Sequence, residues 1–285
     1  MSVSPSVNDR TPQSPDVPGD DVLFRGRGVT RTFGRGEKLV EAVKDVSFSL
    51  SRGQITTVVG ESGSGKSTIA RMLLGLMPIT SGRLVFQGKD VTHLKARART
   101  EYWRDVQAVF QDPFAAFNQF FTVGRLLNRS TLLVGREVGR QRLEEALGHV
   151  GMDASVLSRY PHELSGGQRQ RVMIARALMM QPKLLIADEA TSMLDASLRV
   201  NILNVLKDLR DDLGMTVLFI THDIGQACYL ADRVLVMEQG SMVEQGSTDE
   251  VIFNPQHEYT KRLLADVPKL HSTIELGDLH EAVEK

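Results

Sequence analysis

A glycine-rich segment at residues 60–67 constrains the fold of this chain more than any other feature of its sequence. It follows a short β-branched run at residues 55–59, typical of a strand covered on both faces, and precedes an apolar helical pattern at residues 66–76. A strand, a glycine-rich turn and a helix in this order point backbone N–H groups at one spot beside the helix N-terminus, where a phosphate binds. A glycine-rich turn without a ligand is the alternative, but the strand before and the helix after favour a phosphate-binding loop.

The side chains of this loop fit a nucleotide with a magnesium ion. Lys66 can reach the β and γ phosphate oxygens, and the Ser67 hydroxyl can bind Mg²⁺. The glycines lack the side chains that would stop the backbone from curling round a phosphate. The expected nucleotide contacts cover the whole loop and the residue after it: Gly60, Glu61, Ser62, Gly63, Ser64, Gly65, Lys66, Ser67 and Thr68.

Two carboxylates follow an apolar run at residues 184–187, which we expect to be a buried strand. Ligands of open parallel sheets sit at the carboxyl ends of the strands, where these carboxylates lie. We expect Asp188 to hold Mg²⁺ through its hydration shell, and Glu189 to orient or deprotonate the attacking water. Such a pair alone is more often a helix cap or a solvated edge, but the phosphate loop favours the functional interpretation.

A second glycine-containing segment, at residues 164–168, reads Leu-Ser-Gly-Gly-Gln. Its serine and glycines suit a loop that grips a phosphate from the side opposite the first loop. The two segments together indicate two half-sites that must meet around ATP. The contacts expected from the second half-site are Ser165, Gly166, Gly167 and Gln168.

Composition excludes several classes of function. Lys plus Arg (34) nearly balances Asp plus Glu (35), which argues against a nucleic-acid partner held by nonspecific charge. The one cysteine, Cys228, excludes an internal disulfide framework and fits a reducing compartment. No apolar run approaches the ~18–20 residues that span a bilayer, and residues 1–20 show no signal peptide. We therefore expect a soluble cytosolic chain that reaches a membrane only through a partner.

The order of the expected elements predicts an α/β fold. Residues 29–33 and 46–50 alternate like half-buried antiparallel strands, whereas the run at 217–220 resembles those at 55–59 and 184–187, which we expect in a parallel sheet. A helix capped by a glycine connects the runs at 184–187 and 217–220. Its apolar stripe is Leu198, Ile202, Val205, Leu206, Leu209 and Leu213, followed by Gly214. The last expected elements are a hairpin around Gly240 and helices at residues 248–253 and 257–265.

We expect one folded domain at residues 21–268. It lies between a disordered, proline-rich tail at residues 1–20 and a short polar tail at residues 269–285. Residues from about 112 to 165 have a helical pattern at residues 140–150 and no convincing strand. They predict a helical subdomain inserted into the α/β core.

These motifs together resemble the ATP-binding subunits of ABC transporters over roughly residues 22–268, and residues 164–168 match the signature of that family. The resemblance implies a P-loop NTPase (RecA-like) core with a mainly parallel sheet, an N-terminal antiparallel β subdomain and an inserted α-helical signature subdomain. It also implies an ATPase whose site is shared by two subunits in a head-to-tail dimer. Across that dimer, Ser165 and Gly167 are expected to contact the γ-phosphate held by the other subunit.

The resemblance assigns roles to four further residues. Gln111 matches the Q-loop glutamine that senses Mg²⁺ and the γ-phosphate, and His222 matches the switch histidine that touches the γ-phosphate. Asp195 matches the D-loop aspartate at the dimer interface, and Phe33 matches an aromatic that stacks on adenine. Polar loop residues, a core histidine and ordinary packing are the respective alternatives. The expected catalytic residues are Glu189, His222, Gln111 and Lys66, and the expected metal ligands are Ser67, Gln111 and Asp188.

Residues 159–163 and 254–264 resemble the subfamily that imports peptides and related solutes. Gln119 stands where an Asn-Pro pair is usual, and the aromatic-rich version of this region is similar to branches that carry oligosaccharides, so both solutes stay open. The implied partners are a second ATP-binding subunit, two permease subunits and, indirectly, a solute-binding protein. The second ATP-binding subunit is expected to be a paralogue, with an identical copy as the alternative. The implied location is the cytoplasmic face of the cell membrane, and a soluble ABC-type ATPase or an exporter subunit is the alternative function.

Four phenylalanines follow Gln111 closely: Phe114, Phe117, Phe120 and Phe121. They either line an apolar groove that receives a coupling helix from a membrane subunit or form ordinary core of the helical subdomain. The sequence leaves both interpretations open.

Overall fold

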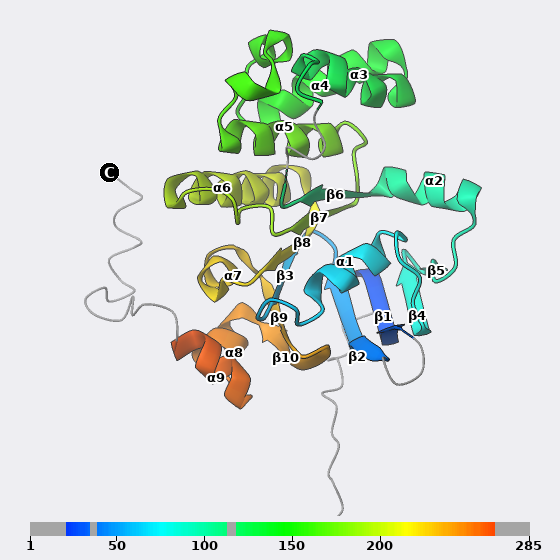
Figure 1. Cartoon of the computed structure of the whole chain (residues 1–285), viewed down its shortest axis with the longest axis vertical. Helices are drawn as coiled ribbons and strands as arrows, with labels where there is room; N and C mark the ends of the chain where they lie inside the picture. Colours follow the sequence, from blue (N-terminus) through cyan, green and yellow to red (C-terminus); the bar gives the residue numbers. More distant parts are fainter. Residues whose placement is uncertain (1–20, 35–38, 113–117, 266–285) are drawn as a thin grey trace, which may run out of the picture.

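The structure is a computed structural model whose described residues form two β-sheets flanked by helices (Figure 1). The residues that it describes are 21–34, 39–112 and 118–265. The two predicted tails lie outside the described residues, as do Phe114 and Phe117.

The larger sheet, within the described residues, has the strand order β10-β9-β3-β8-β7-β6. Its strands are β3 (Ile55–Val59), β6 (Val106–Phe110), β7 (Leu184–Asp188), β8 (Thr216–Thr221), β9 (Arg233–Glu238) and β10 (Ser241–Ser247). Neighbouring strands are parallel except β10, which pairs with β9 in the predicted hairpin. Every residue of β3, β7 and β8 is buried, because both faces of these strands are covered. The predicted parallel sheet is confirmed.

The smaller sheet is antiparallel and has the strand order β2-β1-β4-β5. Its strands are β1 (Val22–Phe33), β2 (Val40–Ser51), β4 (Ser81–Phe86) and β5 (Lys89–Asp90). Side chains such as Phe24 and Phe48 of this sheet share one apolar cluster with Val58 and Ile186 of the larger sheet. The N-terminal antiparallel part of the predicted fold is therefore confirmed, and its core joins the two sheets.

Helices cover the larger sheet on both faces. Their bounds are α1 (Lys66–Leu73), α2 (Ala96–Asp105), α3 (Val123–Val134), α4 (Arg136–His149), α5 (Gly166–Leu178), α6 (Ala196–Leu213), α7 (Ile224–Leu230), α8 (Thr248–Phe253) and α9 (Glu258–Ala265). Figure 1 shows α3, α4 and α5 as a separate layer above α6, whereas α1 lies by the smaller sheet. Helices α3, α4, α5 and α6 form one apolar cluster with one face of the larger sheet. Helix α1 belongs to the cluster on the other face.

Several predicted boundaries differ from the structure. Helix α1 ends at Leu73 rather than at residue 76, because Gly75 adopts a φ of 64°, which ends a helix. Helix α4 begins at Arg136, four residues before the predicted start. Leu213, the last residue of the predicted α6 stripe, is 44% exposed. Helices α3 and α4 lie within the residues of the predicted insertion, and α4 packs on α5, which begins at Gly166.

Candidate nucleotide site

The phosphate loop lies between β3 and α1 and is enclosed by other strands. A Cβ atom on Gly60 would lie 2.1 Å from the carbonyl oxygen of Met237, and one on Gly65 would lie 2.4 Å from that of Ala42. Both glycines have positive φ, 153° for Gly60 and 103° for Gly65. Close approach and backbone conformation therefore both require glycine at these positions.

Lys66 begins α1 and is almost fully buried within the loop. Its Nζ donates hydrogen bonds to the carbonyl oxygens of Gly60 and Glu61, each at 2.7 Å, and lies 3.4 Å from Ser64 Oγ. Burial lowers the pKa of the Lys66 ammonium, and the carboxylates of Glu189 and Asp188 oppose that shift. The loop thus encloses the Lys66 ammonium group, which lies near the carboxylates of Asp188 and Glu189.

Two of the three magnesium ligands predicted from the sequence contact each other. Ser67 Oγ donates a hydrogen bond of 2.9 Å to Asp188 Oδ1 at the carboxyl end of β7. Asp188 is buried, and burial raises the pKa of its carboxyl, although the bond from Ser67 lowers it. A cavity beside this pair is lined by Ser67, Arg71, Phe110, Gln111, Asp112, Met173 and Asp188. Gln111 therefore lines the same cavity as the two other predicted ligands.

Glu189 turns away from β7 next to the end of β8. Its φ is 50°, an uncommon conformation for a residue with a side chain, and its N–H donates to the carbonyl oxygen of Ile220 at 2.9 Å. Its Oε1 lies 3.5 Å from Nδ1 of His222, the residue that follows β8. Because β7 and β8 are adjacent and parallel, the acid and the histidine meet at one edge of the sheet.

A buried hydrogen-bond chain behind this edge has no counterpart in the sequence predictions. The Thr191 hydroxyl donates to Gln226 Oε1 at 2.7 Å, and Gln226 Nε2 donates to Asp223 Oδ2 at 3.0 Å. Thr191 follows Glu189 by two residues, and Asp223 follows His222. Gln226 therefore links the loops that carry the acid and the histidine, although no local pattern marks it.

The second half-site begins α5. Ser165 Oγ accepts a hydrogen bond from the N–H of Gln168, and Gln168 Oε1 accepts one from the N–H of Ser165, which forms a capping box. A Cβ on Gly166 or Gly167 would come within 3.2 Å of a leucine side chain. The cavity lined by Ser165, Gly167 and Gln168 shares no residue with the cavity beside Ser67.

The remaining predicted residues lie around this core. Asp195 accepts hydrogen bonds from Leu198 N–H and Ser197 Oγ and caps α6. Phe33 ends β1, is 37% exposed, and has the Arg31 guanidinium 4.6 Å from its ring centroid. Its strand pairs with β2, whose Ala42 approaches the phosphate loop, so Phe33 lies toward the loop end of the smaller sheet. Their roles stay predictions.

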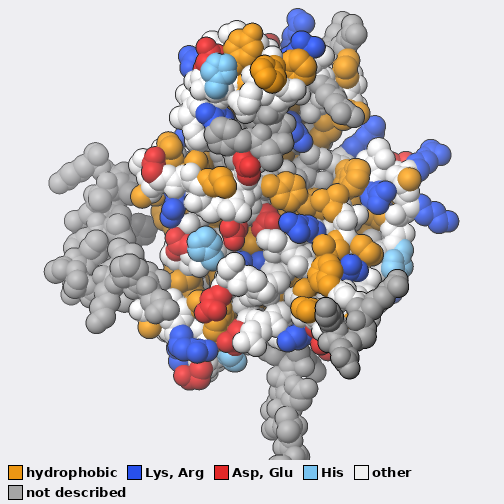
Figure 2. Space-filling model, viewed as in Figure 1, with side chains coloured by type: hydrophobic (Ala, Val, Ile, Leu, Met, Phe, Trp, Pro, Cys, Tyr) orange, Lys and Arg blue, Asp and Glu red, His pale blue; other side chains and the backbone are white. Residues whose placement is uncertain are grey.

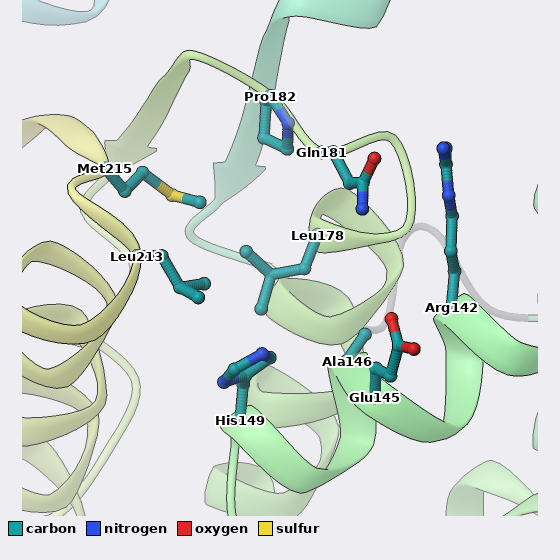
Figure 3. Close-up of a pocket in the computed structure, with 9 residues that line it drawn as sticks. All are labelled: Arg142, Glu145, Ala146, His149, Leu178, Gln181, Pro182, Leu213 and Met215. Carbon is teal, nitrogen blue, oxygen red and sulfur yellow. The ribbon is translucent and has the colours of Figure 1, made fainter.

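Another cavity, of about 270 Å³, lies where α4 meets the end of α6 and the start of β8 (Figure 3). Leu178, Leu213 and Met215 form its apolar side, and Arg142, Glu145 and His149 project from α4. It contains none of the predicted site residues, so the nucleotide site is elsewhere.

The fold is that of an ATP-binding cassette. A model of the ABC transporter family matches residues 43–192. The chain is 42% identical over 242 residues to the oligopeptide transport ATP-binding protein AmiF of Streptococcus pneumoniae. The matched region covers 83% of this chain and 79% of AmiF. It is 40% identical over 249 residues to a putative peptide import ATP-binding protein of Brucella ovis, covering 86% of this chain and 78% of that protein.

Solved structures agree with these relatives. The dimeric, post-hydrolysis ATP-binding cassette MJ0796 bound to ADP and phosphate has a TM-score of 0.70 at 28% identity, covering 79% of this chain and 99% of that chain. CbiO1 of Clostridium perfringens, part of an ABC transporter complex, has a TM-score of 0.75 at 28% identity, covering 92% and 99%. This chain therefore belongs to the ABC transporter family. The predicted family, fold class and enzyme class, an ATPase, are confirmed.

Proposed function

We propose that this chain binds ATP with Mg²⁺ and hydrolyses it as one subunit of a head-to-tail dimer that powers peptide import. The observation that carries the proposal is the division of the site. Lys66, Ser67, Asp188, Glu189 and His222 gather around the phosphate loop. The signature residues Ser165, Gly167 and Gln168 line a different cavity at the start of α5. A second subunit that presents its own signature to this phosphate loop completes the site.

Each predicted residue has a chemical role in this proposal. The Lys66 ammonium pairs with the β and γ phosphate oxygens once it leaves the loop carbonyls. Glu189 acts as the base or orients the attacking water, and His222, 3.5 Å away, contacts the γ-phosphate. Phe33 stacks on the adenine, and Asp195 contributes at the dimer interface.

The donor atoms fit magnesium. Ser67 Oγ and Asp188 Oδ1 are hard oxygen donors 2.9 Å apart, and Gln111 lines the same cavity. Mg²⁺ prefers such oxygens and retains waters and phosphate oxygens in the rest of its coordination sphere. When bound, the ion neutralises charge on the β and γ phosphate oxygens. Ser67, Asp188 and Gln111 would hold it, directly or through water.

A groove near Gln111 supports docking to a permease subunit. The groove has a volume of about 400 Å³, and its exposed apolar side chains are Leu76, Phe110 and Leu133. Phe120 and Phe121 do not line it, and Phe121 instead packs under the Arg125 guanidinium at 3.8 Å. Hydrophobic side chains gather where α2 approaches the helical layer (Figure 2). A coupling helix of a permease would fill this groove with its apolar face.

The proposed assembly follows from this groove and from the names of the relatives. Two permease subunits would bind two ATP-binding subunits, of which the second is a paralogue or an identical copy, and a solute-binding protein would act through the permeases. None of the helices in the described part of the chain is both long and apolar enough to cross a membrane. We place the subunit at the cytoplasmic face of the cell membrane. Relatives named for peptide import favour a peptide over an oligosaccharide as solute.

A complementation experiment tests the shared site. Glu189→Gln removes the base but keeps the signature, and Ser165→Arg blocks the signature but keeps the base. Each variant alone should hydrolyse ATP poorly. A mixture should regain about a quarter of wild-type turnover, because half of randomly paired dimers contain one intact site of two. A mixture without any gain, from variants that still dimerise, would contradict a site built by two subunits.

A further inference from the structure

The C-terminal helix α9 contacts the phosphate loop across a sequence separation of 198 residues. The backbone N–H of Glu61 donates a hydrogen bond of 2.9 Å to the hydroxyl of Tyr259. Tyr259 lies in the first turn of α9 and is 3% exposed. It belongs to the segment at residues 254–264, whose sequence alone predicts only the subfamily of the chain.

Tyr259 is fixed on both sides. Its ring shares an apolar cluster with Val59, the residue directly before Gly60. The carboxylate of Glu244 on β10 accepts hydrogen bonds from the N–H groups of Gln256 (2.7 Å) and His257 (3.1 Å), which tie the start of α9 to the sheet. The hydroxyl is therefore presented to the loop from a rigid position. Burial raises the pKa of this hydroxyl, so it stays neutral at physiological pH.

The start of the loop needs an anchor other than Lys66. An ammonium group has three donors, and the Lys66 donors face Gly60 O, Glu61 O and, at 3.4 Å, Ser64 Oγ. Binding a phosphate requires Lys66 to give up at least one of these contacts. The bond from Glu61 N–H to Tyr259 does not use Lys66, so it can persist when a nucleotide binds.

We propose that Tyr259 is a positioning residue of the nucleotide site, whose hydroxyl fixes the first residues of the phosphate loop for ATP. The inference rests on the proposed function, because it takes this loop as the ATP-binding loop. It makes α9 a part of the nucleotide site without any contact between α9 and the nucleotide. A loop that is ordered before binding loses less conformational entropy when ATP binds.

Tyr259→Phe in the full chain tests this, because it removes the hydroxyl and keeps the buried ring. We expect the Kd for ATP to rise about 5- to 10-fold, the effect of one lost hydrogen bond to a loop amide. The kcat at saturating ATP should stay within about two-fold of wild type, since the reacting groups are unchanged. Amide hydrogen exchange at Glu61 should accelerate without nucleotide. Tyr229→Phe is the matched control, because it removes a hydroxyl bonded to Asn204 on the exposed side of α7.

Two outcomes would overturn the inference, and a third would refute the proposed function on which it rests. Unchanged ATP affinity together with faster exchange at Glu61 would mean that the bond exists but does not position the loop for ATP. A lower melting temperature with unchanged affinity would leave Tyr259 a packing residue. Failure of the wild-type chain to bind ATP would instead refute the proposed function itself, and the control variant would then behave like wild type.

Discussion

Ser67 Oγ donates a hydrogen bond of 2.9 Å to Asp188 Oδ1, joining the end of the phosphate loop to the end of β7. The two residues are 121 positions apart in the sequence. The bond holds two oxygen donors at the spacing that a shared magnesium ion needs. It also keeps a buried carboxylate next to the Lys66 ammonium, so the charge balance of the site depends on this pair.

Asp188→Asn should separate metal binding from stability. Asparagine keeps an oxygen that can accept from Ser67 but removes the negative charge, so we expect Mg²⁺-dependent ATP turnover to fall at least about 10²-fold. The same change should stabilise the fold at pH 7 by ~1 kcal/mol, as replacement of strained functional groups often does. Turnover against Mg²⁺ concentration and chemical denaturation measure the two effects.

The pH dependence of this variant has a definite sign. Burial raises the pKa of Asp188 above its unfolded value, so folding favours the protonated carboxyl. Stability from this group is fully present below the unfolded pKa and is lost as pH rises through the folded pKa. The stability advantage of Asp188→Asn should therefore shrink as pH falls below the raised pKa of Asp188. An advantage that grows on acidification would show that the carboxylate is stabilised in the fold.

Glu189→Gln should reduce ATP hydrolysis roughly 10²–10⁴-fold while ATP binding persists, because a general base is lost and no phosphate contact is removed. The variant should accumulate as an ATP-bound dimer, which size-exclusion chromatography with and without ATP can detect. Hydrolysis near the wild-type rate would remove Glu189 from its proposed role and leave only its 3.5 Å contact with His222.

Gln226→Met should slow the chemical step. The substitution fills a similar volume but leaves the Thr191 hydroxyl and the Asp223 carboxylate without the hydrogen bonds that Gln226 makes. We expect kcat to fall about 10-fold with little change in KM, because the loops of Glu189 and His222 lose their link, and stability to fall by roughly 1–3 kcal/mol. Steady-state kinetics well below the melting temperature separate the effects. A stability loss with unchanged kcat would assign Gln226 to packing alone.

The buried strands could be predicted from the sequence because burial on both faces leaves a continuous apolar run. The predicted strand at residues 55–59 matches β3, and that at 184–187 falls one residue short of β7. Helix α2 could not be predicted in this way, since Tyr102 is its only buried side chain. Its position depends on partners that the local sequence does not contain.

The motif residues of the site could likewise be predicted from the sequence, whereas the residues that position them could not. The phosphate loop and the acids of β7 each have a local pattern tied to phosphate and metal chemistry. Tyr259 and Gln226 contact the site through hydrogen bonds that form only after distant elements pack. The helical pattern at residues 140–150 predicts α4, but its packing against α5 depends on contacts that the local sequence does not contain.

The groove near Gln111 is expected to bind a permease subunit through its exposed apolar side chains. Leu133 is 68% exposed and lines the groove, and Phe120 is 87% exposed and lies outside its lining. Leu133→Ser should therefore weaken association with permease subunits, because a partner helix loses an apolar contact worth about 1–2 kcal/mol. Phe120→Ser is the matched control for a lost exposed hydrophobic side chain and should leave association unchanged.

Co-purification of tagged variants with permease measures this association, and ATP turnover of the isolated subunit checks that both variants are folded. If Phe120→Ser weakened association and Leu133→Ser did not, the coupling helix would bind the aromatic segment after Gln111 instead of this groove.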